Sequence, residues 1–405
     1  MFSSNCGESI LRENPLFRVI YDGASFFLPC WLSYVIAGVV IMLILVNAVL
    51  LGAAAVSWME RRLLGRFHNR IGPNRWGPFG TLQPIADLLK LLTKEDLIPA
   101  GADRIAFTLV PILMVSSLVL LTAVIPFAKD TALADLNVGV LYLLAVSSLT
   151  SVALFMAGWA SDNRYALFGA ARGVAVLISY EVPVVLSLLG VVMIAGSMSL
   201  GSIVQAQQVP FILVQPLAFF LFLAGMSAEL NRTPFDLAEA ESEIIAGYHT
   251  EYSGIKFALI QAAEFGGVLV VAALITTLFL GGWAGPLAEY LGWLWFLLKT
   301  ILVVALFSWI RATFPRLRID QIMGFCWKVM LPLSLINLAA TTLEVFFLPD
   351  NGATAVEQWI MVGINLPLAL VCVPLFGRMM QEKPRPGSRP AGVRVVPGIP
   401  TIESS

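Results

Sequence analysis

Residues 31–57 read WLSYVIAGVVIMLILVNAVLLGAAAVS and contain no charged side chain. An α-helix rises 1.5 Å per residue, so about 20 apolar residues cross the hydrocarbon core of a bilayer. In lipid, the backbone has to satisfy its hydrogen bonds within the segment, which favours a helix. This stretch alone predicts that the chain enters a membrane.

The rest of the chain repeats this pattern. Hydrophobic residues make up 58% of the 405 residues and charged residues 13%, whereas soluble domains are about one quarter charged. Further apolar stretches of spanning or nearly spanning length lie at roughly 105–127, 138–160, 174–196, 211–228, 257–284, 291–310, 329–348 and 357–377. The sequence therefore predicts an all-α polytopic membrane protein with about nine transmembrane helices.

Lys and Arg residues gather on one side of these segments. The loops 58–104, 160–173, 229–256 and 311–328 and the tail after residue 377 hold all 25 of them except Arg12, Arg18, Lys129 and Lys299. Short cytoplasmic loops carry an excess of such residues. We therefore expect an outside N-terminus, a cytoplasmic C-terminus and large structured cytoplasmic loops.

Composition divides the chain into three parts. Residues 1–30 are expected to form an outside extension, and residues 31–377 a single transmembrane bundle with its cytoplasmic loops. Residues 378–405 are rich in Pro, Gly and Arg, which predicts a flexible cytoplasmic tail. No internal repeat is evident, which weighs against a repeat-built secondary transporter.

The chain has few groups that could hold a redox centre. Its four cysteines are scattered without a C-x-x-C pair, and it has two histidines. Iron–sulfur clusters need several thiolates at close spacing, and no glycine-rich nucleotide loop follows a strand. We expect no bound metal or flavin in this chain, and we expect the cysteines to be small buried hydrophobic residues.

Three carboxylates lie at membrane depth or at its edge, where ionisable groups are costly and usually functional. Glu181 precedes Pro183, which leaves the carbonyl of Ser179 without its helical donor and could open the helix to water. Glu229 ends the fifth apolar stretch, and Glu264 lies within the sixth beside a Gly-Gly pair. Each could simply bond to a neighbouring helix, but together they predict a row of groups that passes protons.

The loop after the fifth stretch, AELNRTPFDLAEAESEIIAGYHTEYSG at 228–254, concentrates further acid. Its carboxylates are Glu229, Asp236, Glu239, Glu241, Glu243 and Glu251. Thr233 suits a helix N-cap and Pro234 the first helical position, which predicts a short helix over 234–246. Glu239 and Glu243 would share one face, a repulsive spacing that arginines, shared protons or a partner protein has to offset.

The loop 58–104 is the basic counterpart. Its first half contains Arg61, Arg62, Arg66, Arg70 and Arg75. After Pro84, the apolar positions 85, 88, 89 and 92 form one stripe, which predicts an amphipathic helix at the membrane surface or against a partner. The arginines fit either contacts with lipid phosphate or a binding role.

Four blocks of sequence carry a resemblance to a known family. They are ERRLLGRFHNRIGPNRWGPFGTLQPIADLLKLLTKE at 60–95, GWASDNRYALFGAARGVAVLISYEVP at 158–183, the acidic loop at 228–254, and WIRATFPRLRIDQIMGFCWKVMLPL at 309–333. In these blocks the chain resembles the NuoH family, which supplies a membrane subunit of respiratory complex I, the proton-pumping NADH:quinone oxidoreductase. Residues 1–30 and 378–405 lie outside the resemblance.

The resemblance implies roles for particular residues. In that family, this subunit anchors the peripheral arm, builds much of a quinone chamber and couples quinone reduction to proton translocation. Quinone-chamber residues would be Glu60, Arg61, Arg62, Arg66, Arg70 and Arg311. The residues of a buried acidic passage for protons would be Glu181, Glu229, Asp236, Glu239, Glu241, Glu243, Glu251 and Glu264.

The resemblance also implies the surroundings of the chain. The substrate would be a quinone, either ubiquinone or menaquinone, and the location the bacterial inner membrane. Partners would be peripheral-arm quinone-module subunits, other membrane-arm subunits and lipids, with no nucleic acid. Two other interpretations stay open: the homologous anchor of a membrane-bound hydrogenase or of a ferredoxin- or deazaflavin-linked oxidoreductase, and a stand-alone ion transporter.

Overall fold

The computed structural model describes residues 15–25, 29–129, 131–236, 246–348 and 354–379. Within these ranges every regular element is helical, and eight helices are long and apolar enough to cross a membrane. They are α2 (Cys30–Phe67), α4 (Arg104–Ala123), α5 (Gly139–Ala160), α6 (Arg164–Ala195), α11 (Gly254–Phe279), α12 (Ala288–Thr313), the continuous α13–η4–α14 (Ile319–Phe325, Cys326–Met330, Leu331–Phe347) and α15 (Ala355–Met379). The prediction of an all-α polytopic membrane protein is confirmed.

The ninth apolar stretch is broken into two helices. Residues Phe211–Val214 form α8, and Pro216–Glu229 form α9, which is shorter than a full span. The break falls at Gln215, whose φ of −130° and ψ of 66° are not helical. A proline cannot donate the backbone hydrogen bond of a helix interior, so Pro216 starts a new helix instead of continuing the first one.

Shorter helices complete the described part of the chain. They are α1 (Pro15–Ser25), η2 (Pro78–Gly80), α3 (Gln83–Thr93), α7 (Leu200–Ala206) and η3 (Gly247–His249). The helix α3 is the amphipathic helix that the apolar stripe predicts. Its Ile85, Leu88, Leu89 and Leu92 are all about half exposed in this chain alone.

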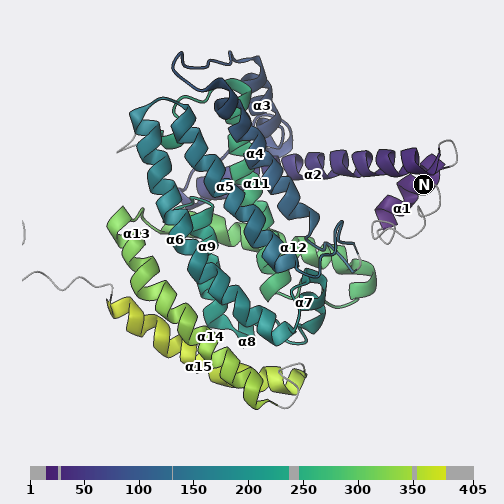
Figure 1. Ribbon diagram of the computed structural model, residues 1–405, viewed down its shortest axis with the longest axis vertical. Helices are drawn as coiled ribbons and strands as arrows, with labels where there is room; N and C mark the ends of the chain where they lie inside the picture. The colour runs from purple at the N-terminus through teal and green to yellow at the C-terminus, as the bar shows by residue number, and fades with distance from the viewer. Residues whose placement is uncertain (1–14, 26–28, 130, 237–245, 349–353, 380–405) are drawn as a thin grey trace, which may run out of the picture.

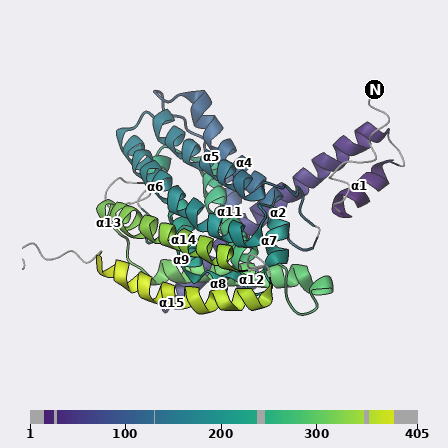
Figure 2. The same ribbon diagram turned by 60° about the horizontal axis from the view of Figure 1, so that its bottom comes forward.

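The helix α2 projects from the bundle as an arm, and α1 folds back beside its outer end (Figures 1 and 2). Phe17 and Tyr21 of α1 pack against Ala37 and Ile41 of α2 in a small separate cluster. At the opposite edge of the molecule, α14 and α15 lie side by side. The arm therefore packs mainly on α1 over its first half and reaches the bundle only through its second half.

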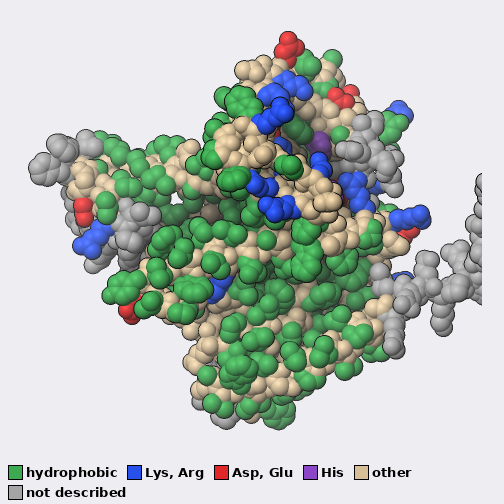
Figure 3. Space-filling model, turned by 180° about the vertical axis from the view of Figure 1, so that it is seen from behind, with side chains coloured by type: hydrophobic (Ala, Val, Ile, Leu, Met, Phe, Trp, Pro, Cys, Tyr) green, Lys and Arg blue, Asp and Glu red, His purple; other side chains and the backbone are tan. Residues whose placement is uncertain are grey.

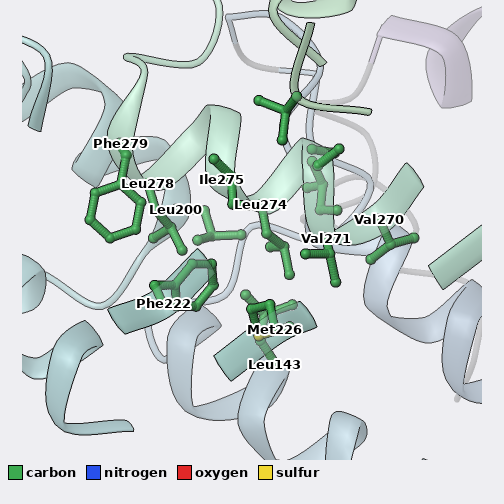
Figure 4. Packing of buried hydrophobic residues seen from close by; sticks show 14 of the residues in the cluster. Leu143, Leu200, Phe222, Met226, Val270, Val271, Leu274, Ile275, Leu278 and Phe279 are labelled. Atoms are coloured by element: carbon green, nitrogen blue, oxygen red, sulfur yellow. The ribbon is translucent and has the colours of Figure 1, made fainter. Parts of the chain in front are cut away.

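The helix α11 lies at the centre of the bundle. Its Leu274, Leu278 and Phe279 meet Phe222 and Met226 of α9 in the largest apolar cluster (Figure 4). A helix that is apolar on every side is expected in such a central position. The Gly-Gly pair of α11 allows close packing without breaking the helix, because a methyl group at Gly266 would lie 2.4 Å from a side-chain carbon of Leu118.

Basic side chains gather toward one end of the molecule. Figure 3 shows Lys and Arg over its upper and right-hand parts, whereas the lower part is mostly apolar. This arrangement agrees with the asymmetry of the loops in the sequence. The assignment of that end to the cytoplasm stays a prediction.

The segment after Arg232 differs from the prediction. Residues 233–236 form a turn, not the start of a helix, and the peptide bond before Pro234 is cis. The carbonyl of Pro234 accepts a hydrogen bond from the backbone N–H of Leu317 at 3.1 Å, so a distant loop sets the backbone here. The remainder of the expected helix, 237–245, lies outside the described residues.

Candidate functional site

Glu60, near the end of α2, is the centre of a buried charged cluster. Its side chain is 5% exposed, and both of its oxygens accept from Arg232 Nη1, at 2.8 and 2.9 Å. Arg311, in the last turn of α12, donates to Oε1 of the same carboxylate. The guanidinium of Arg232 also lies 4.7 Å from the ring centroid of Phe265. A carboxylate at this depth needs such compensation, and here it joins α2, α12 and the 230–236 loop.

The two arginines after Glu60 point to other partners. Arg61 pairs with Asp87 of α3 at 2.6 Å. Arg62 donates to the carbonyl of Phe79 at 2.8 Å and lies 4.8 Å from the centroid of its ring. Successive helical residues point about 100° apart, so this run of charges fixes α2 to both α3 and the turn before it.

Arg66 and Arg70 line a polar hollow of about 860 Å³. The other residues around it are Arg62, Asn69, Ile71, Gly72, Pro73 and Asn74. Of the six residues expected at a quinone chamber, the structure brings Glu60 and Arg311 together. It places Arg61, Arg62, Arg66 and Arg70 on the side of α2 that faces the 69–80 turn and α3.

The loops at this end are tied to one another by further charged contacts. Asp236 pairs with Arg316 at 2.8 Å, and Glu251 accepts from the amide of Asn163 at 2.7 Å. Both carboxylates belong to the predicted acidic passage, but here each holds a neighbouring loop in place. Neither lines the cavity described below.

A tyrosine ring anchors the end of the acidic loop. Tyr252 stacks on Phe107 with ring centroids 4.1 Å apart. Burial raises the pKa of the Tyr252 hydroxyl, so this side chain is a neutral phenol. Beside it, Lys256 pairs with Asp96 at 3.0 Å, which ties α11 to the end of the basic loop.

A cavity of about 1050 Å³ lies inside the bundle, between α4, α5, α6, α9 and α11. Its wall is mostly apolar, and two predicted carboxylates, Glu229 and Glu264, belong to it. Glu264 accepts a hydrogen bond from the hydroxyl of Tyr248 at 2.5 Å and one from the amide of Gln261 at 3.3 Å. Leu230 and Asn231 line the end of the cavity next to Arg232.

The third predicted carboxylate lies in an adjoining cavity of about 260 Å³. Glu181 lines it together with three serines of α5, Ser147, Ser148 and Ser151. Glu229 lines both cavities and is in hydrogen-bonding contact with Ser147. The three carboxylates therefore border two neighbouring spaces, with Glu229 between the other two.

The helix that carries Glu181 stays closed at Pro183. Residues Arg164–Ala195 form one continuous helix, so the expected local opening is wrong for the backbone. The carbonyl of Ser179, which Pro183 cannot serve, accepts a hydrogen bond from the thiol of Cys326 at 3.0 Å. Cys326 is fully buried, as expected, but it also supplies this polar contact.

Some expected residues cannot be placed, and others were not expected. Glu239, Glu241 and Glu243 lie outside the described residues. Arg232, Arg316 and Tyr248 form contacts that sequence reasoning did not assign to them. Arg232 could have been suspected because it is the only Arg in a strongly acidic stretch. Within the described ranges, no group of three or more His, Cys, Asp or Glu residues could hold a metal ion.

The fold and the site define a class: a polytopic helical membrane protein whose charged loops meet a cavity that holds membrane-embedded carboxylates. The family model described as NADH dehydrogenase matches residues 39–342 of the chain. The chain therefore belongs to this family.

Three relatives narrow the comparison, and each is named as the H subunit of NADH-quinone oxidoreductase. The Dehalococcoides mccartyi protein is 54% identical over 339 residues, which cover 84% of this chain and 94% of the relative. The Geobacillus kaustophilus protein is 54% identical over 288 residues, 70% of this chain and 86% of the relative. The Syntrophobacter fumaroxidans protein, the second of that name, is 48% identical over 308 residues, 74% and 92%. None of these three is named as a hydrogenase anchor or a transporter.

Proposed function

We propose that the chain is the membrane-arm NuoH subunit of an NADH-quinone oxidoreductase of the complex I type. In this role it works with the other subunits of that enzyme, in a bacterial inner membrane, on a membrane quinone. It carries no redox centre of its own, and it forms part of the quinone chamber. It couples quinone reduction to proton translocation through carboxylates inside its bundle.

One observation carries this proposal: the cavities bordered by Glu181, Glu229 and Glu264 end beside the Glu60 cluster. Leu230 and Asn231 line the larger cavity, and the next residue, Arg232, binds Glu60. A change of charge near the guanidinium groups is therefore transmitted over a short distance to the carboxylates in the bundle.

Electrostatics supplies the coupling. Reduction of a quinone places negative charge in a low-dielectric space until protons arrive, and guanidinium groups stabilise that charge. Arg311 and Arg232 share one carboxylate, so a second anion nearby would compete with Glu60 for them. Carboxylates that interact this closely titrate as a set, so protonation of one changes the proton affinity of the others.

The test uses the assembled complex in sealed vesicles with the variant Glu229→Gln, which keeps shape and removes the exchangeable charge. We expect NADH oxidation with a soluble artificial acceptor to stay at the wild-type rate. Quinone-dependent proton translocation should fall to a small fraction of its wild-type value. Both rates are measured on the same vesicles, together with the amount of assembled complex.

A matched control is Glu289→Gln, because Glu289 lies exposed in the first turn of α12, away from the cavities. It should leave all three readouts unchanged. Wild-type proton translocation in Glu229→Gln would contradict the coupling role. A loss of complex in both variants alike would show that the substitutions act on assembly only.

A further inference from the structure

A second set of buried polar side chains lies where the α8–α9 break meets α14 and α15. The proposed function uses none of them. Gln215, Asn337, Thr341 and Asn365 are each at most 2% exposed, and Glu344 is 8% exposed. Burial of so many polar groups in an apolar bundle is costly unless each atom finds a partner.

Direct contacts join these side chains into one network. The amide of Gln215 donates to the hydroxyl of Thr341 at 2.9 Å. The amide of Asn365 donates to Glu344 Oε2 at 2.9 Å and to the carbonyl of Val214, at the break, at 3.0 Å. Residues 337, 341 and 344 are spaced by four and three positions, so they share one face of α14.

Three polar atoms in this network have no hydrogen-bond partner among the described residues: Gln215 Oε1, Asn337 Nδ2 and Glu344 Oε1. The first two face the same point on α6, because a methyl group at Gly190 would lie 3.1 Å from one and 3.2 Å from the other. The missing side chain at Gly190 leaves room there. Buried sites with two to four polar partners and sufficient room hold ordered water.

Among the described residues, no positive charge lies close to Glu344. The elements packed against α14 are α6, α9, η4 and α15. Their charged residues are Arg164, Arg172, Glu181, Glu229, Lys328, Glu357 and Arg378. On α15, Glu357 is about 12 Å from Asn365 at 1.5 Å per residue, and it is acidic. An ionised Glu344 would therefore be an uncompensated charge inside the membrane bundle.

We infer that Glu344, Asn365, Gln215 and Asn337 form a hydrated proton-binding site. Glu344 carries a proton, and ordered water completes the bonding of its Oε1 and of the free amide atoms of Gln215 and Asn337. The proton comes from water and returns to water, so no other reactant is needed. Glu229 lies at the opposite end of α9, about 20 Å away, so this site is separate from the carboxylates of the cavities.

Infrared spectroscopy of the assembled complex in lipid nanodiscs tests this site directly. A protonated carboxyl group gives a carbonyl stretch that a carboxylate lacks. We expect one such band in the wild type to shift on transfer to D2O and to be lost in Glu344→Gln. Glu344→Asp should move the band without removing it, and the exposed control Glu289→Gln should leave it unchanged.

Each other result overturns the inference. If Glu344→Gln loses no protonated-carboxyl band, Glu344 is ionised. If the band is lost in the variant but does not shift in D2O, the acid is dry and exchanges no proton with water. If added sodium removes the band from the wild type, the oxygens bind a metal cation in place of the proton. If Glu344→Gln does not assemble, an unchanged band in Glu344→Asp shows equally that the band does not arise from Glu344.

Discussion

Glu60 and its two arginines depend on one another at the scale of single residues. The carboxylate is buried and binds both Arg232 and Arg311. Glu60→Gln would leave two guanidinium groups without their shared anion, a change that costs about 3–5 kcal/mol when a buried pair is broken. We expect a lower melting temperature of the purified complex and less of this chain in the membrane, measured by thermal denaturation and quantitative immunoblotting.

The neighbouring pair provides the control for this prediction. Arg61 and Asp87 are closer than many ion pairs, at 2.6 Å, but the arginine is 46% exposed. Exposed pairs contribute about 0–1 kcal/mol, so Arg61→Gln should barely change the melting temperature. Equal losses of stability in Glu60→Gln and Arg61→Gln would contradict the special role of the buried cluster.

Tyr252 supports a second prediction at this scale. Its hydroxyl is buried without a hydrogen-bond partner among the described residues, while its ring stacks on Phe107. Tyr252→Phe keeps the stack and removes a desolvated polar group, so stability should stay within about 1 kcal/mol of the wild type. Tyr252→Leu, which removes the stack, should be clearly less stable in thermal denaturation. A larger loss in Tyr252→Phe would reveal a partner for the hydroxyl.

At the scale of elements, the contact between α6 and η4 replaces one missing backbone hydrogen bond. The thiol of Cys326 serves the Ser179 carbonyl that Pro183 leaves free. Cys326→Ala should therefore cost about 1–3 kcal/mol through the orphaned carbonyl. In the double variant with Pro183→Ala, the new backbone N–H can reach that carbonyl, and part of the loss should be recovered.

A double-mutant cycle measures this coupling. Thermal denaturation of the wild type, both single variants and the double variant gives the interaction energy. A value outside experimental error, with the double variant more stable than the sum of the single effects predicts, supports the contact. Strict additivity would mean that thiol and proline act independently.

The accuracy of the sequence predictions depends on whether an element is set locally. The helix α3 follows from the spacing of its own apolar residues, and the expected stripe is present. The turn at 233–236 does not, because its backbone is held by Leu317, more than eighty residues away. The same limit applies to α6, where a cysteine from another helix replaces the expected opening.

At the scale of the whole molecule, the side on which the basic loops lie can be tested by labelling. In a background without the four native cysteines, we place single cysteines at Lys94 and Lys129, which are both exposed. A membrane-impermeant thiol reagent should label Lys94→Cys only from the cytoplasmic side and Lys129→Cys only from the outside. Labelling of both from the same side would refute the predicted topology.

The candidate site is partly readable from the sequence for a reason that also acts at this scale. An acid within an apolar stretch is conspicuous, so Glu181, Glu229 and Glu264 could be singled out, and the structure places them around adjoining cavities. Their partners were not conspicuous. Glu60 and Arg232 are 172 positions apart and Asn163 and Glu251 are 88 apart, so only the packed bundle brings these pairs together.

The projecting arm has a consequence for how a cell makes this chain. The outer half of α2 packs on α1 and otherwise presents large apolar side chains, including Val35, Val39, Met42 and Leu43, each more than half exposed. As the first long apolar helix, it leaves the ribosome before the rest of the bundle exists. Its place in the membrane is therefore fixed by lipid or by a neighbouring subunit. In cells that lack those neighbours, membrane proteases would meet this chain with its arm unprotected.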